Sequence, residues 1–361
     1  MNNKPTLLCL FGGKSTEYEI SLRSVTSILE NVDREKYNVV TVGITKDGRW
    51  YYYTGSIEAI RDGSWCDQTD SLCEALLSPS FGSSELLILD GDKVERMHID
   101  VIFPVMHGGY SEDGKLQGLL EMTGIPFVGN KCTTSAIAMD KGFTKLILKN
   151  LGIPQAKSII VRGEAIANSF DKIRAGCEKL SGYPLFVKPA NGGSSVGTAK
   201  VKNAAELRGA LERAALIDKK IIVEEFITAK ECEVAVMGNS SYTASTVGQI
   251  NSGSAFYDYD AKYASDSQAT YNIPADIKPE TATAIRNMAK QICSVLGVEG
   301  LSRVDFFVRT KDGREEIIFN EINTLPGFTS ISMYPKLFCH DGMTYSEIID
   351  RLCDLALGKE A

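Results

Sequence analysis

The stretch LSRVDFFVRT (301–310), the turn KDGR (311–314) and the stretch EEIIFNEINT (315–324) together have the pattern of a β-hairpin. Both outer segments are rich in β-branched and aromatic residues, and an Asp-Gly pair lies between them. We set the register of the two strands about Gly313. This register predicts which side chains of the two strands share a face.

In this register Arg303 faces Asn323, and Asp305 faces Glu321. Because side chains alternate along a strand, all four point to one side, and the apolar residues between them can be buried on the other. Two carboxylates and an amide beside a guanidinium form a hard-oxygen pocket of the kind that Mg²⁺ uses between protein and nucleotide phosphates. Any one of these residues alone is more often part of a solvated surface. The four together, followed by TLPGFTS (324–330), favour a site.

The composition is that of a soluble globular protein with ample apolar material for a core, with 43% hydrophobic and 24% charged residues. At 361 residues the chain is too long for one ordinary core, so two or three domains of about 100–150 residues are expected. The net charge of −7 argues against a nucleic-acid surface, which requires a basic stripe. Local lysines and metal ions remain sufficient to bind phosphates.

The nine cysteines are scattered and form no CxxC pair, so neither a disulfide framework nor a zinc site is expected. The chain starts with MNNKP (1–5) and passes directly into a strand-like run, without the apolar region of a signal peptide. No apolar run approaches the 18 or so residues of a membrane span. We therefore expect a cytoplasmic protein that does not cross a membrane.

The first segments predict an α/β unit. TLLCLF (6–11) is a buried-strand candidate that ends in two glycines, and a helix is expected to begin near Ser21. A glycine turn at the end of such a strand can bind a ligand, although a plain turn is favoured for this motif alone. Residues 54–84 show no steady period and are expected to be irregular. After the buried run 101–106, His107 is either a ligand-cleft residue or a structural histidine.

The middle of the chain contains a second distinctive motif. One helix is expected over residues 133–150, with Asp140-Lys141 inside it. The strand LFVKP (185–189) then leads into ANGGSSVG (190–197), whose backbone N–H groups and hydroxyls can fold over phosphate oxygens. The motif is not a GxxxxGK[ST] phosphate loop, because Lys188 precedes the glycines and a strand follows them. A mobile surface hairpin is the alternative.

Further segments predict nucleotide contacts and a lid. The strand IIVEEFI (221–227) could present backbone groups to an adenine edge and Glu231 to a ribose, or it could be an inter-domain connector. A long polar loop (256–271) with Lys262-Tyr263 is of the kind that often forms a lid. Helices are expected at 279–296 and 345–357.

Taken together and in this order, the motifs resemble the ATP-grasp ligases, and within them the D-alanine–D-alanine ligases and their D-serine- and D-lactate-using relatives. The resemblance covers essentially the whole chain. Its most specific parts are FGGKSTEYEIS (11–21), HGGYSEDGKLQG (107–118), AMDK (138–141), VKPANGGSSVG (187–197), AKY (261–263) and EINTLPGFTSISMYP (321–335).

The resemblance implies an α/β and α+β fold of three domains. These would be a Rossmann-like parallel-sheet domain (1–132), a central ATP-grasp subdomain (133–227) and a C-terminal subdomain (228–361) that holds the metal and substrate site. It implies ATP and two Mg²⁺ ions, with Mn²⁺ as a possible substitute, two D-alanine molecules as substrates, and a homodimer.

The resemblance also implies roles for individual residues. Catalytic roles would fall to Glu17, Ser194, Tyr263, Arg303 and Gly327, of which Arg303 and the Gly327 N–H would stabilise an oxyanion. Substrate would be held by His107, Lys262, Ser332 and Met333. ATP would be held by Lys141, Lys188, Glu224, Glu225, Phe226, Ile227, Glu231 and Asn320. Mg²⁺ would be held by Asp305, Glu321 and Asn323.

The segments AKY (261–263) and SMYP (332–335) argue against another ATP-grasp carboxylate–amine ligase, and two further alternatives remain. D-Serine could replace D-alanine as second substrate, since WYYYTGS (50–56) is similar to the D-serine ligases, whereas Met333 offers an apolar wall suited to a methyl group. The chain could also be a non-catalytic ATP-binding protein. The presence of all the metal and phosphate ligands that the resemblance implies argues against this second alternative.

Overall fold

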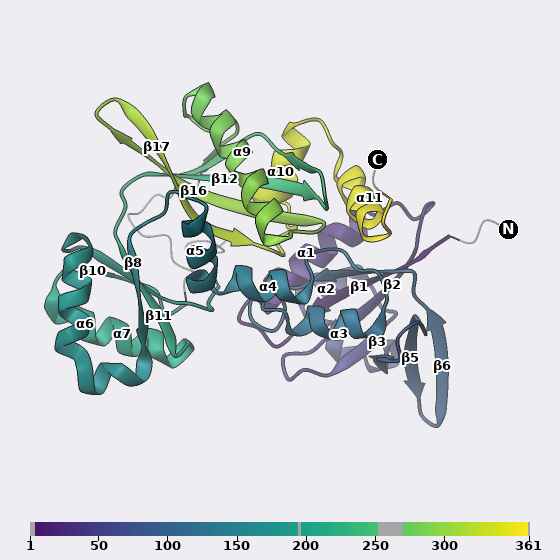
Figure 1. The fold of residues 1–361 in the computed structure, drawn as a ribbon. Coiled ribbons are helices and arrows are strands. Elements are labelled where there is room, and N and C mark those ends of the chain that lie inside the picture. Colours follow the sequence, from purple (N-terminus) through teal and green to yellow (C-terminus); the bar gives the residue numbers. More distant parts are fainter. Residues whose placement is uncertain (1–3, 194–195, 252–269, 360–361) are drawn as a thin grey trace.

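The computed structural model describes residues 4–193, 196–251 and 270–359, and three β-sheets form within them (Figure 1). The N-terminal sheet has the strand order β6-β5-β4-β3-β2-β1-β7. Strand β1 runs parallel to β2 and β7, and the remaining neighbours are antiparallel. The strands are β1 (Thr6–Gly12), β2 (Asn38–Ile44), β3 (Trp50–Tyr53), β4 (Leu72–Leu77), β5 (Glu85–Asp90), β6 (Lys93–His98) and β7 (Val101–Val105).

Both faces of this sheet are covered, which explains why β1 is an uninterrupted apolar run. Odd-numbered residues such as Leu7 pack against α1 (Tyr18–Asn31), whereas even-numbered residues such as Leu8 pack against α3 (Lys115–Thr123). The prediction of an α/β unit with a parallel strand pair is confirmed. Helix α1 starts at Tyr18, three residues before the expected start.

The expectation of irregular structure at residues 54–84 is wrong. The segment contains α2 (Ile57–Asp62), two short 3-10 helices, η1 (Ser64–Asp67) and η2 (Thr69–Ser71), and the strand β4. The fully buried Trp65 orders it, because its ring packs edge-on against Phe11 at a centroid distance of 4.9 Å. Such a tertiary contact leaves no periodic pattern in the sequence.

The central sheet has the order β10-β9-β11-β8, and its core is closed by α6 and α7. Its strand β9 ends at the Lys188-Pro189 pair, as predicted. Its elements are β8 (Ser158–Arg162), η3 (Gly163–Ala165), α6 (Ile166–Ser181), β9 (Leu185–Pro189), β10 (Ala199–Val201), α7 (Ala204–Ile217) and β11 (Lys220–Glu225).

The single helix expected over residues 133–150 is also wrong. The chain forms α4 (Cys132–Met139) and α5 (Lys141–Asn150), separated by Asp140 in an extended conformation. The Asp140 side chain accepts hydrogen bonds from the N–H groups of Gly142 and Phe143, both at 3.0 Å, and so caps α5. It also pairs with Lys220. The break places Lys141 at the first position of α5.

The C-terminal sheet has the order β15-β14-β12-β16-β17, with β13 paired to β12. Helix α9 spans Pro279–Leu296 as predicted and buries its apolar face on this sheet. Helix α11 begins at the predicted Tyr345, and it crosses back to α1 and β7 of the N-terminal sheet (Figure 1). The remaining elements are β12 (Lys230–Gly238), β13 (Tyr242–Ala244), β14 (Gly248–Asn251), β15 (Thr270–Asn272), β16 (Leu301–Lys311), β17 (Arg314–Asn323), α10 (Met333–His340) and α11 (Tyr345–Ala356).

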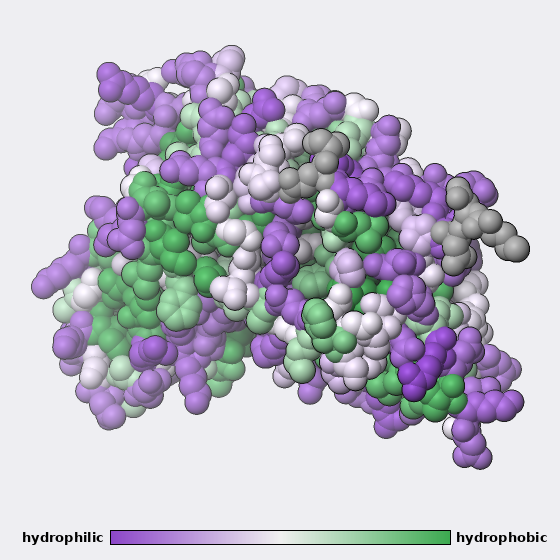
Figure 2. Space-filling model, turned by 45° about the vertical axis from the view of Figure 1, so that its right-hand side comes forward, coloured by the Kyte–Doolittle hydropathy of each residue, from purple (hydrophilic) through white to green (hydrophobic). Residues whose placement is uncertain are grey.

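Polar side chains cover much of the face shown in Figure 2, and hydrophobic side chains gather in separate areas of it. In the part of the chain that the structure describes, no helix combines the length and the apolar character needed to cross a membrane.

Candidate active site

The hairpin of β16 and β17 brings together the four side chains that its register predicted. Arg303 pairs with Asn323 and Asp305 pairs with Glu321. The turn itself differs from the one assumed, because Lys311 pairs with Arg314 and only Asp312 and Gly313 form the loop. Both loop residues have positive φ, 50° and 75°, as in a type I′ turn.

A β-bulge shifts the register between the turn and the site, so the predicted pairs form although the loop is shorter. Phe306 pairs with Phe319, whereas the preceding residue, Asp305, pairs with Glu321. Asn320 is therefore the extra residue of β17. Its side chain and that of Glu321 both line the same cavity, which an unbroken strand would not allow.

Arg303 lies in a network of acidic and amide groups. Its Nε and one terminal nitrogen donate to the two oxygens of Asp305, both at 2.8 Å, and Glu233 lies 3.1 Å from its Nε. Asn323 Nδ2 donates to Asp305 at 3.0 Å. Burial opposes the charge of Arg303, but Asp305 and Glu233 outweigh it and raise its pKa well above the usual range. The guanidinium therefore stays charged.

The site is a cavity of about 430 Å³, lined by strands of the central and C-terminal sheets together with α1 and the loop after β7. Asp305, Ser332 and Met333 are not among the residues that line it. Ser194, Lys262 and Tyr263 lie outside the described residues, so their predicted roles stay predictions. The lining contains these residues named by the sequence: Glu17, His107, Lys141, Lys188, Glu224, Glu225, Phe226, Ile227, Glu231, Arg303, Asn320, Glu321, Asn323 and Gly327.

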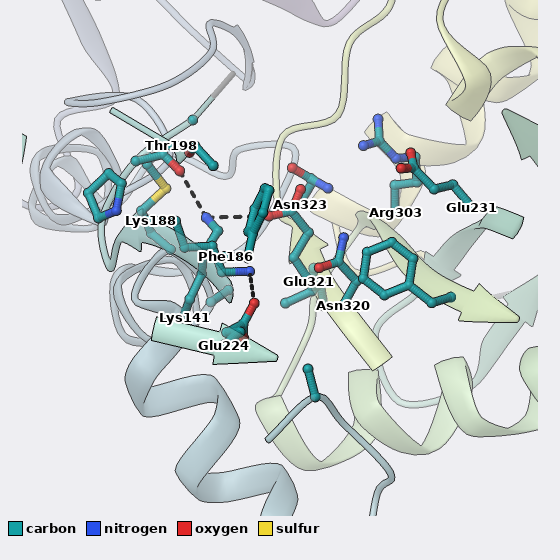
Figure 3. A pocket seen from close by; sticks show the side chains of 18 of the residues that line it. Lys141, Phe186, Lys188, Thr198, Glu224, Glu231, Arg303, Asn320, Glu321 and Asn323 are labelled. Atoms are coloured by element: carbon teal, nitrogen blue, oxygen red, sulfur yellow. Dashed lines mark hydrogen bonds and ion pairs between the residues drawn. The ribbon is translucent and has the colours of Figure 1, made fainter. Parts of the chain in front are cut away.

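Lysines from α5 and β9 meet carboxylates in this cavity (Figure 3). Lys141 Nζ lies 3.4 Å from Glu321 Oε2 and donates to the carbonyl of Gly192 at 2.8 Å. Lys188 Nζ lies 2.7 Å from Glu224 Oε2. The cation at the start of α5 thus joins the hairpin to the loop that follows β9.

Glu224 lies between two buried lysines. The second one, Lys145, is one helical turn after Lys141 and lies 2.6 Å from Glu224 Oε1. Burial disfavours the charge of Glu224, but Lys188 and Lys145 outweigh it and lower its pKa. Burial lowers the pKa of Lys145, and Glu224 opposes this change. Two positive charges and one negative charge thus occupy a single buried cluster.

A second acidic region of the cavity contains Glu17 and Glu112. A Cβ placed on Gly108 would lie 2.4 Å from Glu17 Oε2, and one on Gly193 would lie 3.0 Å from the same oxygen. Glu112 accepts from the Gly108 N–H at 3.3 Å. Burial raises the pKa of Glu112 to about 8, and the charge of Glu17 adds to this effect. Both loops therefore approach Glu17 closely, and Gly108 also has a positive φ of 75°, which favours glycine.

Ser332 and Met333 lie near the cavity without lining it. Ser332 Oγ accepts from the Thr329 N–H at 3.0 Å and would lie 2.7 Å from a Cβ on Gly327. Met333 is buried, and its Cε would lie 2.3 Å from a Cβ on Gly248. The proposed contact of Met333 with a substrate methyl group stays a prediction.

Several lining or neighbouring residues were missed by the sequence analysis. Lys145 could have been found, because it lies four residues after Lys141 on the same helix face. Phe186 could also have been found, since it shares a strand face with Lys188. No local pattern marked Glu233, whose partner Arg303 is on a different strand.

The donor set fits Mg²⁺. Two carboxylates, Asp305 and Glu321, and the carboxamide of Asn323 lie on one face of the hairpin. Glu321, whose side chain is 26% exposed, and Asn323 line the cavity, whereas Asp305 does not line it and is bound by Arg303. Hard oxygen ligands of this kind suit Mg²⁺ when it retains water or phosphate oxygens. Among the described residues, His, Cys, Asp and Glu side chains form no group of three that could hold a metal on its own. Any ion here would therefore depend on Asn323 and on substrate oxygens.

Comparisons with known proteins cover the whole chain. Residues 6–130 match the family profile described as D-ala D-ala ligase N-terminus, and residues 147–354 match the profile described as D-ala D-ala ligase C-terminus. The D-alanine–D-alanine ligases of Acetivibrio thermocellus and Clostridium novyi are each 43% identical to this chain. The alignments cover 99% of this chain in both cases, and 97% and 99% of the relatives.

Solved structures of the same group are also similar. The VanG D-Ala:D-Ser ligase from Enterococcus faecalis is 36% identical with a TM-score of 0.87, and the alignment covers 98% of this chain and 100% of that one. The D-alanine–D-alanine ligase from Coxiella burnetii is 31% identical with a TM-score of 0.84, and the alignment covers 99% and 94%.

Proposed function

Because this chain belongs to the D-alanine–D-alanine ligase family, we propose that its cleft joins two D-alanines into D-alanyl-D-alanine for peptidoglycan precursors. The reaction consumes ATP, as in the rest of this ATP-dependent family. The observation that carries the proposal is the meeting of Lys141, Lys188, Glu321 and Glu17 in one cavity. Phosphate-binding cations, metal-binding oxygens and an acidic site for an ammonium group are the parts that the reaction requires.

In the first step, a carboxylate oxygen of one D-alanine attacks the γ-phosphorus of ATP, and the bond to ADP breaks. Charge develops on the transferring group, so catalysis consists mainly of positioned positive charge. Lys141 and Lys188 bind phosphate oxygens, and Glu17 binds the ammonium group of the first D-alanine. Asp305, Glu321 and Asn323 would hold two Mg²⁺ ions, which neutralise phosphate charge when bound.

The adenine is accommodated at the end of β11. The rings of Phe186 and Phe226 lie 6.5 Å apart, and Lys200 Nζ lies 3.7 Å from the centre of the Phe226 ring. These flat and cationic groups form one side of the cavity beside the backbone of residues 225–227. In this proposal Glu231 accepts from the ribose and Asn320 contacts ATP; both residues line the cavity.

In the second step, the amine of another D-alanine attacks the carbonyl carbon of the acyl phosphate. A C–N bond forms, phosphate leaves, and the nitrogen loses a proton. Arg303 and the Gly327 N–H stabilise the oxyanion that develops. Arg303 suits this role because its neighbouring carboxylates keep it charged. Ser332, beside Gly327, binds the carboxylate of the second D-alanine.

D-Alanine is proposed for the second position. The curated relatives described above are D-alanine–D-alanine ligases, and Met333 is an apolar residue next to Ser332. The VanG structure keeps D-serine as the alternative. We also propose a homodimer and a cytoplasmic location, and the nine free cysteines support a reducing compartment.

The test is ADP release by the purified protein with ATP and Mg²⁺. D-Alanine should stimulate release strongly over the rate without amino acid, and L-alanine should not. The variant Glu321→Gln should abolish stimulation with the fold retained, since it removes one carboxylate charge and little volume. A protein that binds ATP but releases no ADP with D-alanine would refute the proposal. Wild-type turnover of Glu321→Gln at saturating Mg²⁺ would refute the metal assignment.

A further inference from the structure

A buried histidine connects α1, the loop after β7 and the loop after β17. His107 is 5% exposed and Ser24 of α1 is 0% exposed. His107 Nε2 lies 2.9 Å from Ser24 Oγ, and His107 Nδ1 lies 3.0 Å from the carbonyl oxygen of Leu325. The N–H of Phe328 donates to Ser24 Oγ at 3.2 Å. We name Ser24 and His107, with the backbone groups of Leu325 and Phe328, the Ser24–His107 clip.

The partners determine where each proton lies. The carbonyl of Leu325 can only accept, so His107 carries its proton on Nδ1. Nε2 is then an acceptor, and Ser24 donates its hydroxyl proton to it. The Ser24 oxygen keeps a lone pair for the N–H of Phe328. The hydrogen bonds thus run in one direction, from Phe328 through Ser24 to His107, and this direction requires a neutral imidazole.

The Ser24–His107 clip forms hydrogen bonds with the backbone on both sides of Gly327. Leu325 precedes this residue by two positions, and Phe328 follows it directly. The hydroxyl of Tyr345 donates to the carbonyl of Phe328. The Phe328 ring packs against Phe103 at 5.8 Å between ring centres. Pro326 and Gly327 therefore lie between residues that are held by α1, by the loop after β7 and by α11.

We propose that Ser24 is a positioning residue that, through His107, sets the orientation of the Gly327 N–H for the second chemical step. The inference rests on the proposed function, in which that N–H stabilises the oxyanion. Neither Ser24 nor the link between His107 and the Leu325–Phe328 backbone belongs to the chemistry described above. An error of a fraction of an ångström in a donor matters, because oxyanion stabilisation depends on preorganised geometry.

Protonation of His107 would reverse the direction of its hydrogen bond with Ser24, because a charged imidazole can donate but cannot accept. Burial lowers the pKa of His107, and the charge of Glu17 opposes this. Glu112 also lies beside the loop that follows β17, and burial raises its pKa. Tyr345 of α11 contacts the same loop, and burial raises the pKa of the Tyr345 hydroxyl. Removing the Ser24 hydroxyl removes a donor to the neutral form of His107, so the His107 pKa should rise.

The test compares Ser24→Ala with Thr26→Val. Thr26 is a buried hydroxyl of the same helix, and within the described part of the chain it donates to the Leu22 carbonyl of that helix at 2.8 Å. Positional isotope exchange in ATP with D-alanine measures reversible phosphoryl transfer, and steady-state turnover measures the whole reaction. We expect Ser24→Ala to lower kcat roughly ten-fold or more, since losing one oxyanion donor altogether costs about 100- to 1,000-fold. Isotope exchange should not fall, because a slower second step lets more acyl phosphate return to ATP.

Ser24→Ala should also move the acid limb of the kcat–pH profile to higher pH. Thr26→Val should change neither kcat nor this acid limb. If folded Ser24→Ala has the wild-type kcat and acid limb, the inference is wrong. Equal losses in isotope exchange and kcat would also overturn it, by assigning Ser24 to general structure. If Ser24→Ala does not fold, Ser24→Cys decides, because a thiol of similar size is only a weak donor to His107 and a weak acceptor for Phe328, so the same loss of kcat is expected and a wild-type kcat would overturn the inference. Absence of D-alanine-dependent exchange in the wild type would refute the proposed function instead.

Discussion

The buried cluster of Lys145, Glu224 and Lys188 provides the charges of the proposed nucleotide site. The side chains are 8%, 6% and 8% exposed, so water does little to stabilise their charges. One carboxylate serves two ammonium groups, which leaves a net positive charge beside the predicted phosphate position. A lysine that is held by a buried carboxylate loses little freedom when it binds an anion.

This arrangement predicts unequal effects of neutralising its members. Glu224→Gln leaves two buried lysines without a counter-charge and should destabilise the fold by roughly 3–5 kcal/mol, the usual cost of removing one partner of a buried pair. Lys145→Met retains the Lys188–Glu224 pair and replaces an ammonium by an apolar group of similar length. It should therefore cost much less. Urea unfolding of both variants measures the difference, and equal losses would contradict the assignment of Glu224 as the shared counter-charge.

At the scale of single residues, prediction from sequence succeeded where one motif placed several side chains. The hairpin register gave Arg303, Asp305, Glu321 and Asn323 from period-two alternation alone. It failed for Ser24, because hydrogen bonds to residues 304 positions away leave no local signal.

At the scale of elements, the β16–β17 hairpin depends on its turn and on its bulge. The register set about Gly313 gave the correct pairs at the site although the loop is one residue shorter than that register implies. The bulge adds Asn320 to β17 and so compensates for the shorter loop. Residue propensities alone cannot predict where a bulge occurs. The break at Asp140 is similar, since a side-chain cap and a partner on β11 favour it over a continuous helix.

The turn predicts a stability effect without a catalytic one. Gly313 has φ of 75°, and a Cβ there would meet no atom within 4 Å, so the cost of a side chain comes from the backbone alone. Gly313→Ala should lower the free energy of unfolding by about 1–2 kcal/mol, the cost of a left-handed conformation. Asp312→Asn is the control, because asparagine tolerates the same φ.

Turnover per folded molecule should be unchanged in both turn variants, since the loop lies at the far end of the strands from Asp305 and Glu321. Chemical denaturation gives the stabilities. No loss of stability in Gly313→Ala would show that the turn has another conformation in solution.

At the scale of the whole molecule, the first and last segments share one core. Leu352 and Ile348 of α11 belong to the same buried cluster as Leu7 of β1 and Val25 of α1. Figure 1 shows α11 beside the N-terminal elements. The cavity is lined by α1, the loop after β7, the central sheet and the β16–β17 hairpin. Helix α11 supports the loop that carries Gly327, because the Tyr345 hydroxyl donates to the Phe328 carbonyl.

This shared core predicts that residues 1–132 alone do not fold as in the full chain, because the face that α11 covers would be open to water. The matching substitution is Leu352→Ala, which should cost about 2–5 kcal/mol. Hydrogen exchange of β1 and β7 amides in the full-length variant measures how far the loss spreads. Faster exchange confined to α11 would contradict the shared core.

The central claim is that the cleft makes D-alanyl-D-alanine, and the identity of the product tests it most directly. Wild-type protein is supplied with ATP, Mg²⁺ and equal concentrations of D-alanine and D-serine near neutral pH, and the dipeptides are separated by mass. An unpaired buried hydroxyl costs about 1–3 kcal/mol, so D-alanyl-D-alanine should exceed D-alanyl-D-serine by roughly ten-fold or more, as 1.4 kcal/mol is a factor of ten. D-Alanyl-D-serine as the major product would contradict the account.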